Sequence, residues 1–163
     1  MFFWFAGLSF FAVLVVFSSP ALDFRLVMAG AVLPEVETLI GGPWLLHTLS
    51  AACVLLAFVM LATQKQRLRR RQWLGLPIGL FMHLVLDGTW ANAEVFWWPF
   101  LGFSNILGSA QGIDFSRSVP VLVAMEIVGL ATLVFLVRRL DLAGEGRQTF
   151  LSTGQVLRSK LEN

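Results

Sequence analysis

WLGLPIGLFMHLVLDGTW, residues 73–90, decides the fold class of this chain. The segment is almost entirely apolar and approaches the length of about 20 residues that a membrane-spanning helix needs. It nevertheless contains His83 and Asp87, four residues apart, so that in a helix both side chains lie on one face. Because an ionisable pair is costly to keep at membrane depth, the pair indicates a functional site. The competing interpretation is a His–Asp hydrogen bond that only helps helices to pack.

The composition of the whole chain is that of a membrane protein. Of 163 residues, 57% are hydrophobic and 13% are charged, and the mean hydropathy is +0.77. Soluble domains are about 45–50% apolar and about 25% charged. Cys53 is the single cysteine, which excludes an intramolecular disulfide and a cysteine-based zinc site. The net charge of +2 comes from clustered basic runs, so we expect no nucleic-acid partner.

Apolar runs separated by polar turns predict an all-α bundle of about five membrane spans. We expect the spans near residues 2–17, 21–40, 44–63, 73–90 and 118–137, followed by a cytoplasmic tail at 141–163 with a short amphipathic helix. The first run lacks a basic leading region and an A-x-A cleavage site, so it is interpreted as a retained span and not as a signal peptide. Residues 91–117 are expected to form a partly helical lid at the outer membrane surface.

The second segment is interrupted at Pro34, beside Glu35 and Glu37. Proline lacks a backbone donor and biases the preceding residue, Leu33, away from helical geometry, so we expect a break or kink. Irregular backbone at membrane depth is tolerated only against protein or a water-filled cavity. Two carboxylates beside such a break therefore suggest a site, the alternative being an interfacial helix end solvated by water.

Two basic runs set the expected orientation. Lys65, Arg67 and Arg69–Arg71 form a short loop between two spans, and Arg138 and Arg139 end the last span. Basic residues beside spans stay on the cytoplasmic side, which predicts a multi-pass inner or plasma membrane protein with a cytoplasmic C-terminus. Nucleic-acid binding by the first run is the competing interpretation, but topology explains these charges fully.

This orientation gathers the ionisable residues of the spans in one outer layer. Imidazole and carboxylate ligands without sulfur suit Zn²⁺, Mn²⁺ or Fe²⁺, of which we favour Zn²⁺. Such an ion activates water and polarises a phosphoryl or acyl oxygen. The alternative is a proton or ion relay. The small number of spans, the absence of an internal repeat and the apolar inner half of the spans argue against it. The residues in the layer are Glu35, Glu37, His47, His83, Asp87 and Glu126.

Four short motifs resemble the YdjM-like family of bacterial inner-membrane metal-dependent hydrolases. They are LPEVE at 33–37, HT at 47–48, HLVLDGTW at 83–90 and FWWPFLG at 96–102. The resemblance covers roughly residues 26–102. It implies metal ligation by acidic residues of the first motif, by His47 and by the His83–Asp87 pair. The H-x-x-x-D spacing is also similar to that of zinc-dependent phospholipases C, which implies phosphoester hydrolysis.

The chain departs from the family pattern at three places. Glutamate replaces the family's aspartate at positions 35 and 37, Thr38 stands where a histidine is usual, and the family's histidine near the N-terminus is missing. These departures imply a single metal, weaker binding or lost catalysis.

The sequence therefore predicts a membrane-embedded, metal-dependent hydrolase of a lipid-linked phosphoester, with an extracytoplasmic site. The expected metal ligands are Glu35, His47, His83 and Asp87, and Glu37 is expected to act as general base or fifth ligand. Arg117 is a candidate for pairing with a substrate phosphate, or else an interfacial anchor. The alternative function is a non-catalytic membrane subunit whose polar layer holds helices together or contacts a partner protein. Besides the lipid substrate, a membrane protein or a second copy of the chain is a candidate partner.

Overall fold

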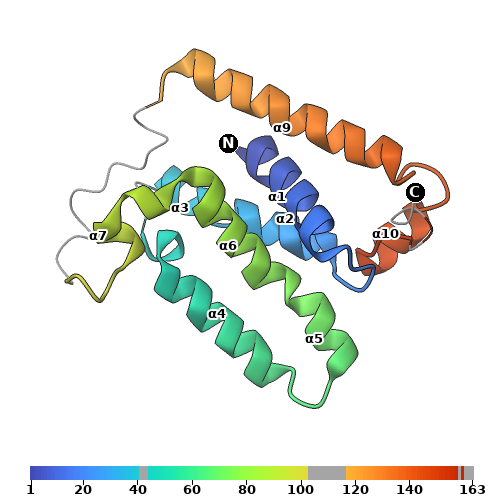
Figure 1. Cartoon of the computed structure of the whole chain (residues 1–163), viewed down its shortest axis with the longest axis horizontal. Coiled ribbons are helices and arrows are strands. Elements are labelled where there is room, and N and C mark those ends of the chain that lie inside the picture. The colour runs from blue at the N-terminus through green and yellow to red at the C-terminus, as the bar shows by residue number, and fades with distance from the viewer. Residues whose placement is uncertain (41–43, 103–116, 158, 160–163) are drawn as a thin grey trace.

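Two helix pairs in close contact form the centre of the molecule. In the computed structural model, which describes residues 1–40, 44–102, 117–157 and 159, α2 (Phe24–Val32) packs on α6 (Gly75–Asp87) and α1 (Phe2–Phe17) packs on α9 (Val119–Arg139) (Figure 1). Helix α1 also contacts α2 and α6, which joins the two pairs. Every regular element among the described residues is a helix, which confirms the all-α class.

Glycines let both pairs approach to backbone contact. A Cβ on Gly79 or Gly30 would overlap the main chain of the facing helix, so α2 and α6 touch directly. Gly7 and Gly129 do the same for α1 and α9. Small residues at such crossings are typical of helix pairs that associate in a membrane. The contact between α2 and α6 brings the backbone of α2 beside the polar residues of α6.

The predicted break near Pro34 is present in the structure. Helix α2 ends at Val32, and the short helix α3 (Glu35–Ile40) begins directly after Pro34. The expectation that Leu33 leaves helical geometry is wrong, because its φ of −53° and ψ of −42° are those of a right-handed helix. The chain continues through a tight turn instead, in which the amide of Glu37 donates to the Pro34 carbonyl at 2.9 Å.

His47 lies before α4 (Leu49–Ala62) and not inside an α-helix, although the span expected at 44–63 included it. It ends a 3₁₀ turn, η1 (Leu45–His47), and α4 follows. Thr48 separates the two as the N-cap, since its hydroxyl oxygen accepts from the amide of Ala51 at 3.1 Å. The cap fixes where the helix begins and leaves His47 in the turn.

The basic run is helical, and the expectation of a loop at 65–71 is wrong for most of it. Helix α5 (Arg67–Trp73) contains four of the arginines and leads into α6 through Leu74, which keeps helical dihedrals. The amide of Leu74 donates to the Arg70 carbonyl at 2.9 Å, so the hydrogen-bond pattern continues across the junction. Arginine is a good helix former, which explains why the run extends the helix.

The predicted outer lid is partly described. A second 3₁₀ turn, η2 (Thr89–Ala91), and the short helix α7 (Ala93–Phe96) follow α6. The Ser50 hydroxyl donates to the carbonyl of Trp98, which ties this segment to α4. The part of the expected lid at 103–116 lies outside the described residues.

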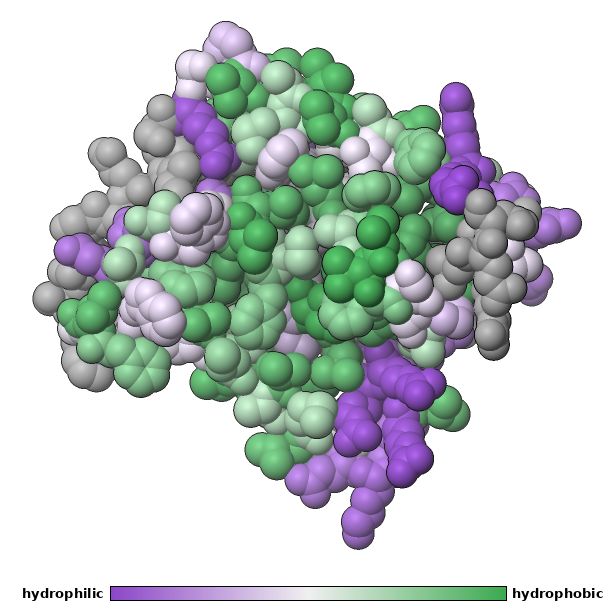
Figure 2. Space-filling model, viewed as in Figure 1, coloured by the Kyte–Doolittle hydropathy of each residue, from purple (hydrophilic) through white to green (hydrophobic). Residues whose placement is uncertain are grey.

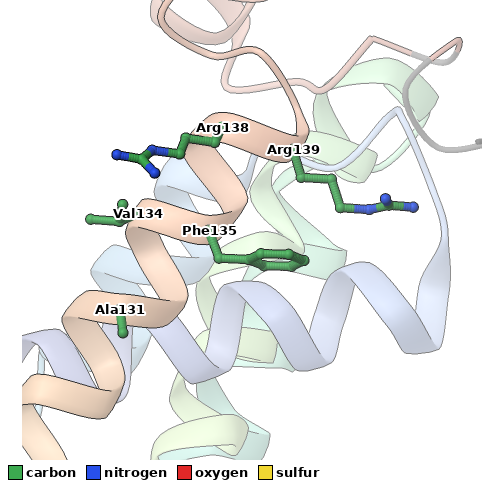
Figure 3. A pocket seen from close by; sticks show the side chains of 5 residues that line it. All are labelled: Ala131, Val134, Phe135, Arg138 and Arg139. Atoms are coloured by element: carbon green, nitrogen blue, oxygen red, sulfur yellow. The ribbon is translucent and has the colours of Figure 1, made fainter.

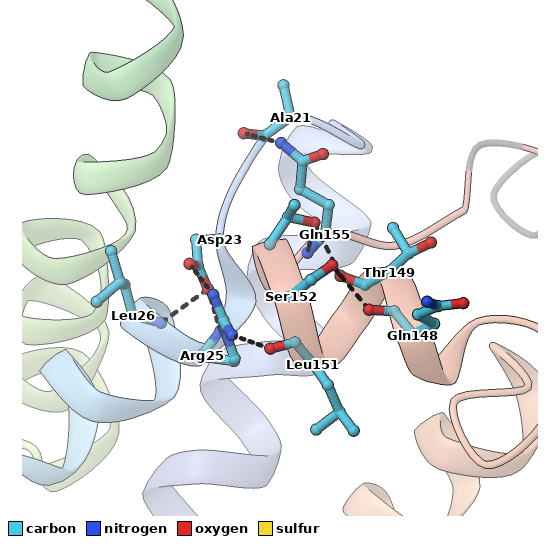
Figure 4. A network of polar contacts seen from close by, with 10 residues as sticks. Ala21, Asp23, Arg25, Leu26, Gln148, Thr149, Leu151, Ser152 and Gln155 are labelled. Atoms are coloured by element: carbon cyan, nitrogen blue, oxygen red, sulfur yellow. Dashed lines mark hydrogen bonds and ion pairs between the residues drawn. The ribbon is translucent and has the colours of Figure 1, made fainter.

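The segment after α9 folds back onto the start of α2. The tail was expected to carry a short helix, which is α10 (Arg147–Thr153). Asp23 caps α2 and also pairs with Arg25, whose guanidinium donates to the Leu151 carbonyl at 2.6 Å (Figure 4). The amide of Phe24 donates to the carbonyl of Gly154 at 2.8 Å. The described part of this segment is thus packed against the helical domain.

Among the described helices, α9 alone has the length and composition to cross a membrane. Helices α1 and α4 are apolar but shorter, at 16 and 14 residues. Two of the predicted spans are longer than the helices found there. The 3₁₀ turn η1 occupies the start of the span expected at 44–63, and Pro34 divides the span expected at 21–40. Figure 2 shows a largely hydrophobic face whose strongly hydrophilic residues gather towards its edges.

Candidate metal centre

Three buried side chains converge where η1 meets the end of α6. His47, His83 and Asp87 each offer one ligand atom, and these atoms lie within 4.8 Å of one another. Their residues are 2%, 0% and 5% exposed. His83 and Asp87 share one face of α6 as their spacing predicted, while His47 reaches them from the 3₁₀ turn. This group could hold a metal ion.

The acceptors beside the two histidines favour one tautomer of each ring. Nδ1 of His83 is 2.7 Å from the carbonyl oxygen of Ala31, which can only accept, so this nitrogen donates. Nδ1 of His47 is 3.1 Å from Oε2 of Glu37 and donates to that carboxylate. In neutral imidazoles both Nε2 atoms then carry lone pairs. Each histidine thus turns a metal-ligating nitrogen towards the other.

The separation of these two nitrogens fits a shared ion. Nε2 of His47 and Nε2 of His83 are 3.3 Å apart. Two ligand nitrogens at the usual zinc distance and tetrahedral angle would be about 3.3–3.4 Å apart. Two facing lone pairs repel each other, so a proton or a metal ion between them would make the contact favourable. With Asp87, the group offers three nitrogen and oxygen ligand atoms, which is the number that catalytic metal sites commonly take from the protein.

Asp87 forms hydrogen bonds with Thr89, close to it in the sequence, and with Arg117, which is distant in the sequence. The Thr89 hydroxyl donates to Oδ2 of Asp87 at 2.6 Å. Arg117, the predicted substrate-binding residue, donates from Nη2 to the backbone carbonyl of Asp87 at 3.1 Å. The arginine is therefore next to the group, although its contact there is with the main chain. Gly88, at a φ of 76°, ends α6 and turns the chain so that Thr89 folds back.

Glu37 holds the turn that carries His47. Its Oε2 accepts from the amide of Trp44 at 3.0 Å, and its Oε1 accepts from the amide of Leu46 at 2.9 Å. The bond to Nδ1 of His47 completes these contacts. A carboxylate on the outer nitrogen of a ligating histidine fixes its orientation and raises its basicity. These bonds give Glu37 a positioning function, and its assignment as general base stays a prediction.

Glu35 lies outside the group of three. Its Oε2 pairs with the amino group of Met1 at 2.7 Å, and its Oε1 is buried without a hydrogen-bond partner among the described residues. The same amino group is 3.9 Å from Glu126, whose Oε2 accepts from the amide of Phe3 at 2.8 Å. The assignment of Glu35 as a metal ligand stays a prediction. Glu126 thus accepts from a backbone amide at the beginning of α1.

Sequence reasoning missed three contributors to the centre. They are the Ala31 carbonyl, the Thr89 hydroxyl and the ring of Phe5, whose centroid lies 4.1 Å from that of His83. Thr89 is only two residues from Asp87 in the chain, so its hydroxyl was within local reach of the carboxylate. The carbonyl and the phenyl ring come from other helices and had no local signal.

No family model, no curated protein and no solved structure matches this chain. The resemblance to the YdjM-like family therefore stays a prediction.

Proposed function

We propose that this chain is a membrane-embedded hydrolase that uses one divalent metal ion to cleave a lipid-linked phosphoester. The observation that carries the proposal is the pair of inward-facing Nε2 atoms, 3.3 Å apart, with Asp87 beside them. His47, His83 and Asp87 would hold the ion, and the nitrogen and oxygen donors favour zinc. Bound there, the ion would supply Lewis acidity and an activated water.

The residues around the ligands have distinct tasks in this proposal. Glu37 and the Ala31 carbonyl keep the two imidazoles in the tautomer that ligates, and the Thr89 hydroxyl orients the carboxylate of Asp87. Arg117, beside Asp87, is suited to pair with the phosphate of a substrate once it is bound. Burial of all three ligands excludes bulk water, which strengthens their hold on a cation.

Five spans and an outward-facing site are part of the proposal. In Figure 1 one end of the helix bundle has the turn between α4 and α5 at the bottom of the picture and the end of α9 at its right, and the other end has the N-terminus, α3 and α7 towards the left and upper left. The basic residues belong to the first end and the metal centre to the second. Positive residues stay inside, so this separation supports an extracytoplasmic site in the inner or plasma membrane.

A proton shared between the imidazoles is the competing explanation of the same geometry. One histidine would then be an imidazolium, balanced by Glu37, and the layer would hold helices together without catalysis. This is the scaffold function, and it predicts a protein that takes up no metal.

Metal content and hydrolysis measured on the same preparations test the proposal. We expect zinc-loaded wild-type protein to cleave a lipid phosphoester in micelles, and Asp87→Asn to lower metal content and turnover together. Asn keeps the size and the acceptor for Thr89 but removes the charge. Glu145→Gln, an exposed carboxylate beyond α9, is the matched control and should change neither. Metal-loaded protein that is inert towards a broad panel of phosphoesters and carboxylic esters would defeat the proposed function.

A further inference from the structure

A groove on the last two turns of α9 is separate from the metal centre. It has a volume of about 640 Å³, and its lining residues are spaced by one, three or four positions along α9 (Figure 3). Residues three or four apart share a helix face, so the lining is one strip, apolar at one end and cationic at the other. The residues are Ala131, Val134, Phe135, Arg138 and Arg139.

The two arginines of the strip have no side-chain partner among the described residues. In the part of the chain that the structure describes, neither Arg138 nor Arg139 forms a side-chain hydrogen bond or an ion pair. Both side chains are exposed. By contrast, the guanidinium of Arg25 pairs with Asp23 at 2.8 Å. The two charges at the end of α9 are therefore available to an external anion.

The apolar half of the strip is open as well. Val134 is 42% exposed and Phe135 is 52% exposed, while Ala131 is too small to fill the space beside them. An occupant that matches the whole strip must be apolar beside Ala131 and negatively charged beside the arginines. A soluble anion would match only the second half, and an uncharged acyl chain only the first.

We infer that this groove binds one anionic phospholipid, its acyl chain along Ala131 and Phe135 and its headgroup between Arg138 and Arg139. Helix α9 is the described helix with the length to span a membrane, and its basic end belongs on the cytoplasmic side. Anionic lipids give the cytoplasmic leaflet its negative surface potential. Figure 3 shows the guanidinium groups directed to opposite sides, so they would flank a headgroup. Exposed side chains reorient within nanoseconds and can close on it.

A weaker explanation needs only the charges. Basic residues at a helix C-terminus complement the helix dipole, and basic residues near a membrane surface attract anionic lipids in general. Neither effect depends on the shape of the groove or on which arginines carry the charge. A bound lipid depends on both, and this difference decides the experiment.

Lipid retention by the purified full chain, measured by native mass spectrometry, tests the inference. The protein is titrated with phosphatidylglycerol or with phosphatidylcholine of identical acyl chains. We expect preferential retention of phosphatidylglycerol, which Arg138→Gln/Arg139→Gln lowers about tenfold or more. Ala131→Trp fills the groove without changing charge and should lower it similarly. Arg69→Gln/Arg71→Gln removes the same charge from exposed positions of α5 and should have little effect.

Three results would overturn the inference. They are equal retention of the two lipids, an equal loss in the α5 control pair, and unchanged retention in Ala131→Trp. The first would show that the chain has no preference for an anionic headgroup, and the other two would reduce the arginines to general electrostatic anchors. The groove shares no residue with the metal group, so metal content should be the same in all variants. A failure here leaves the proposed hydrolase untouched.

Discussion

Nε2 of His47 and Nε2 of His83 face each other at 3.3 Å, while the Nδ1 atom of each ring donates to an acceptor on its other side. The pairing joins a 3₁₀ turn to α6, 36 positions apart in the sequence. If the outer nitrogens donate and both rings are neutral, the inner nitrogens are both acceptors, and a cation between them would complete the contact.

Glu37→Gln should weaken metal binding about 10- to 100-fold, as expected when a group behind a metal ligand is altered. Glutamine keeps one acceptor oxygen, which cannot accept hydrogen bonds from Trp44, Leu46 and His47 together. The turn that carries His47 therefore loosens. Metal affinity is measured by competition with a chromophoric chelator. Thr38→Ser, a neighbour on α3, is the control. If Glu37 is instead a general base, turnover will fall about 10²–10⁴-fold with metal affinity unchanged.

Gly79→Ala should destabilise the protein by about 1–3 kcal/mol, the usual range for overpacking. Its Cβ would overlap the carbonyl oxygen of Val27, so α2 must move away from α6. The same movement withdraws the Ala31 carbonyl from His83, and metal affinity should fall as well. Denaturant unfolding and chelator competition measure the two effects. Ala57→Val adds carbon atoms on an exposed face of α4 and should change neither; equal stability of Gly79→Ala and wild type would refute the close contact.

The proposed orientation predicts which cysteines an impermeant maleimide reaches in intact cells. In a Cys53→Ala background, a cysteine replacing Ala93, at the start of α7, should be labelled from outside. A cysteine replacing Lys65, beside the basic helix α5, should be labelled only after the cells are broken. Both positions are exposed, so access to reagent depends on the side of the membrane. The reverse pattern would put the metal centre on the cytoplasmic side.

Local sequence signals predicted the helical half of the centre. The four-residue spacing of His83 and Asp87 was enough to put both on one face of α6, and Pro34 marked the end of α2. Both inferences rest on helix geometry, which a short segment determines. The all-α class followed from the apolar runs of the sequence and the polar turns between them.

The rest of the centre depends on contacts between distant segments. Glu35 and Glu37, two residues apart, point to different sides of a helix, and only the fold decides that Glu37 meets His47 and Glu35 meets Met1. The 3₁₀ turn ahead of Thr48 could have been inferred from the capping preference of threonine. The Ala31 carbonyl could not, because a backbone acceptor has no side-chain signature.

Metal analysis of purified protein tests the central claim most directly, using wild type and His83→Ala after loading with Zn²⁺, Mn²⁺ or Fe²⁺ and removal of free ions. We predict one divalent ion per wild-type chain and loss of that ion in His83→Ala, with the helical circular dichroism retained. Asp87→Asn, which keeps size, serves as a second variant should His83→Ala fail to fold. Wild-type protein that retains no ion under any loading condition, or a folded His83→Ala that retains a full equivalent, would contradict the account.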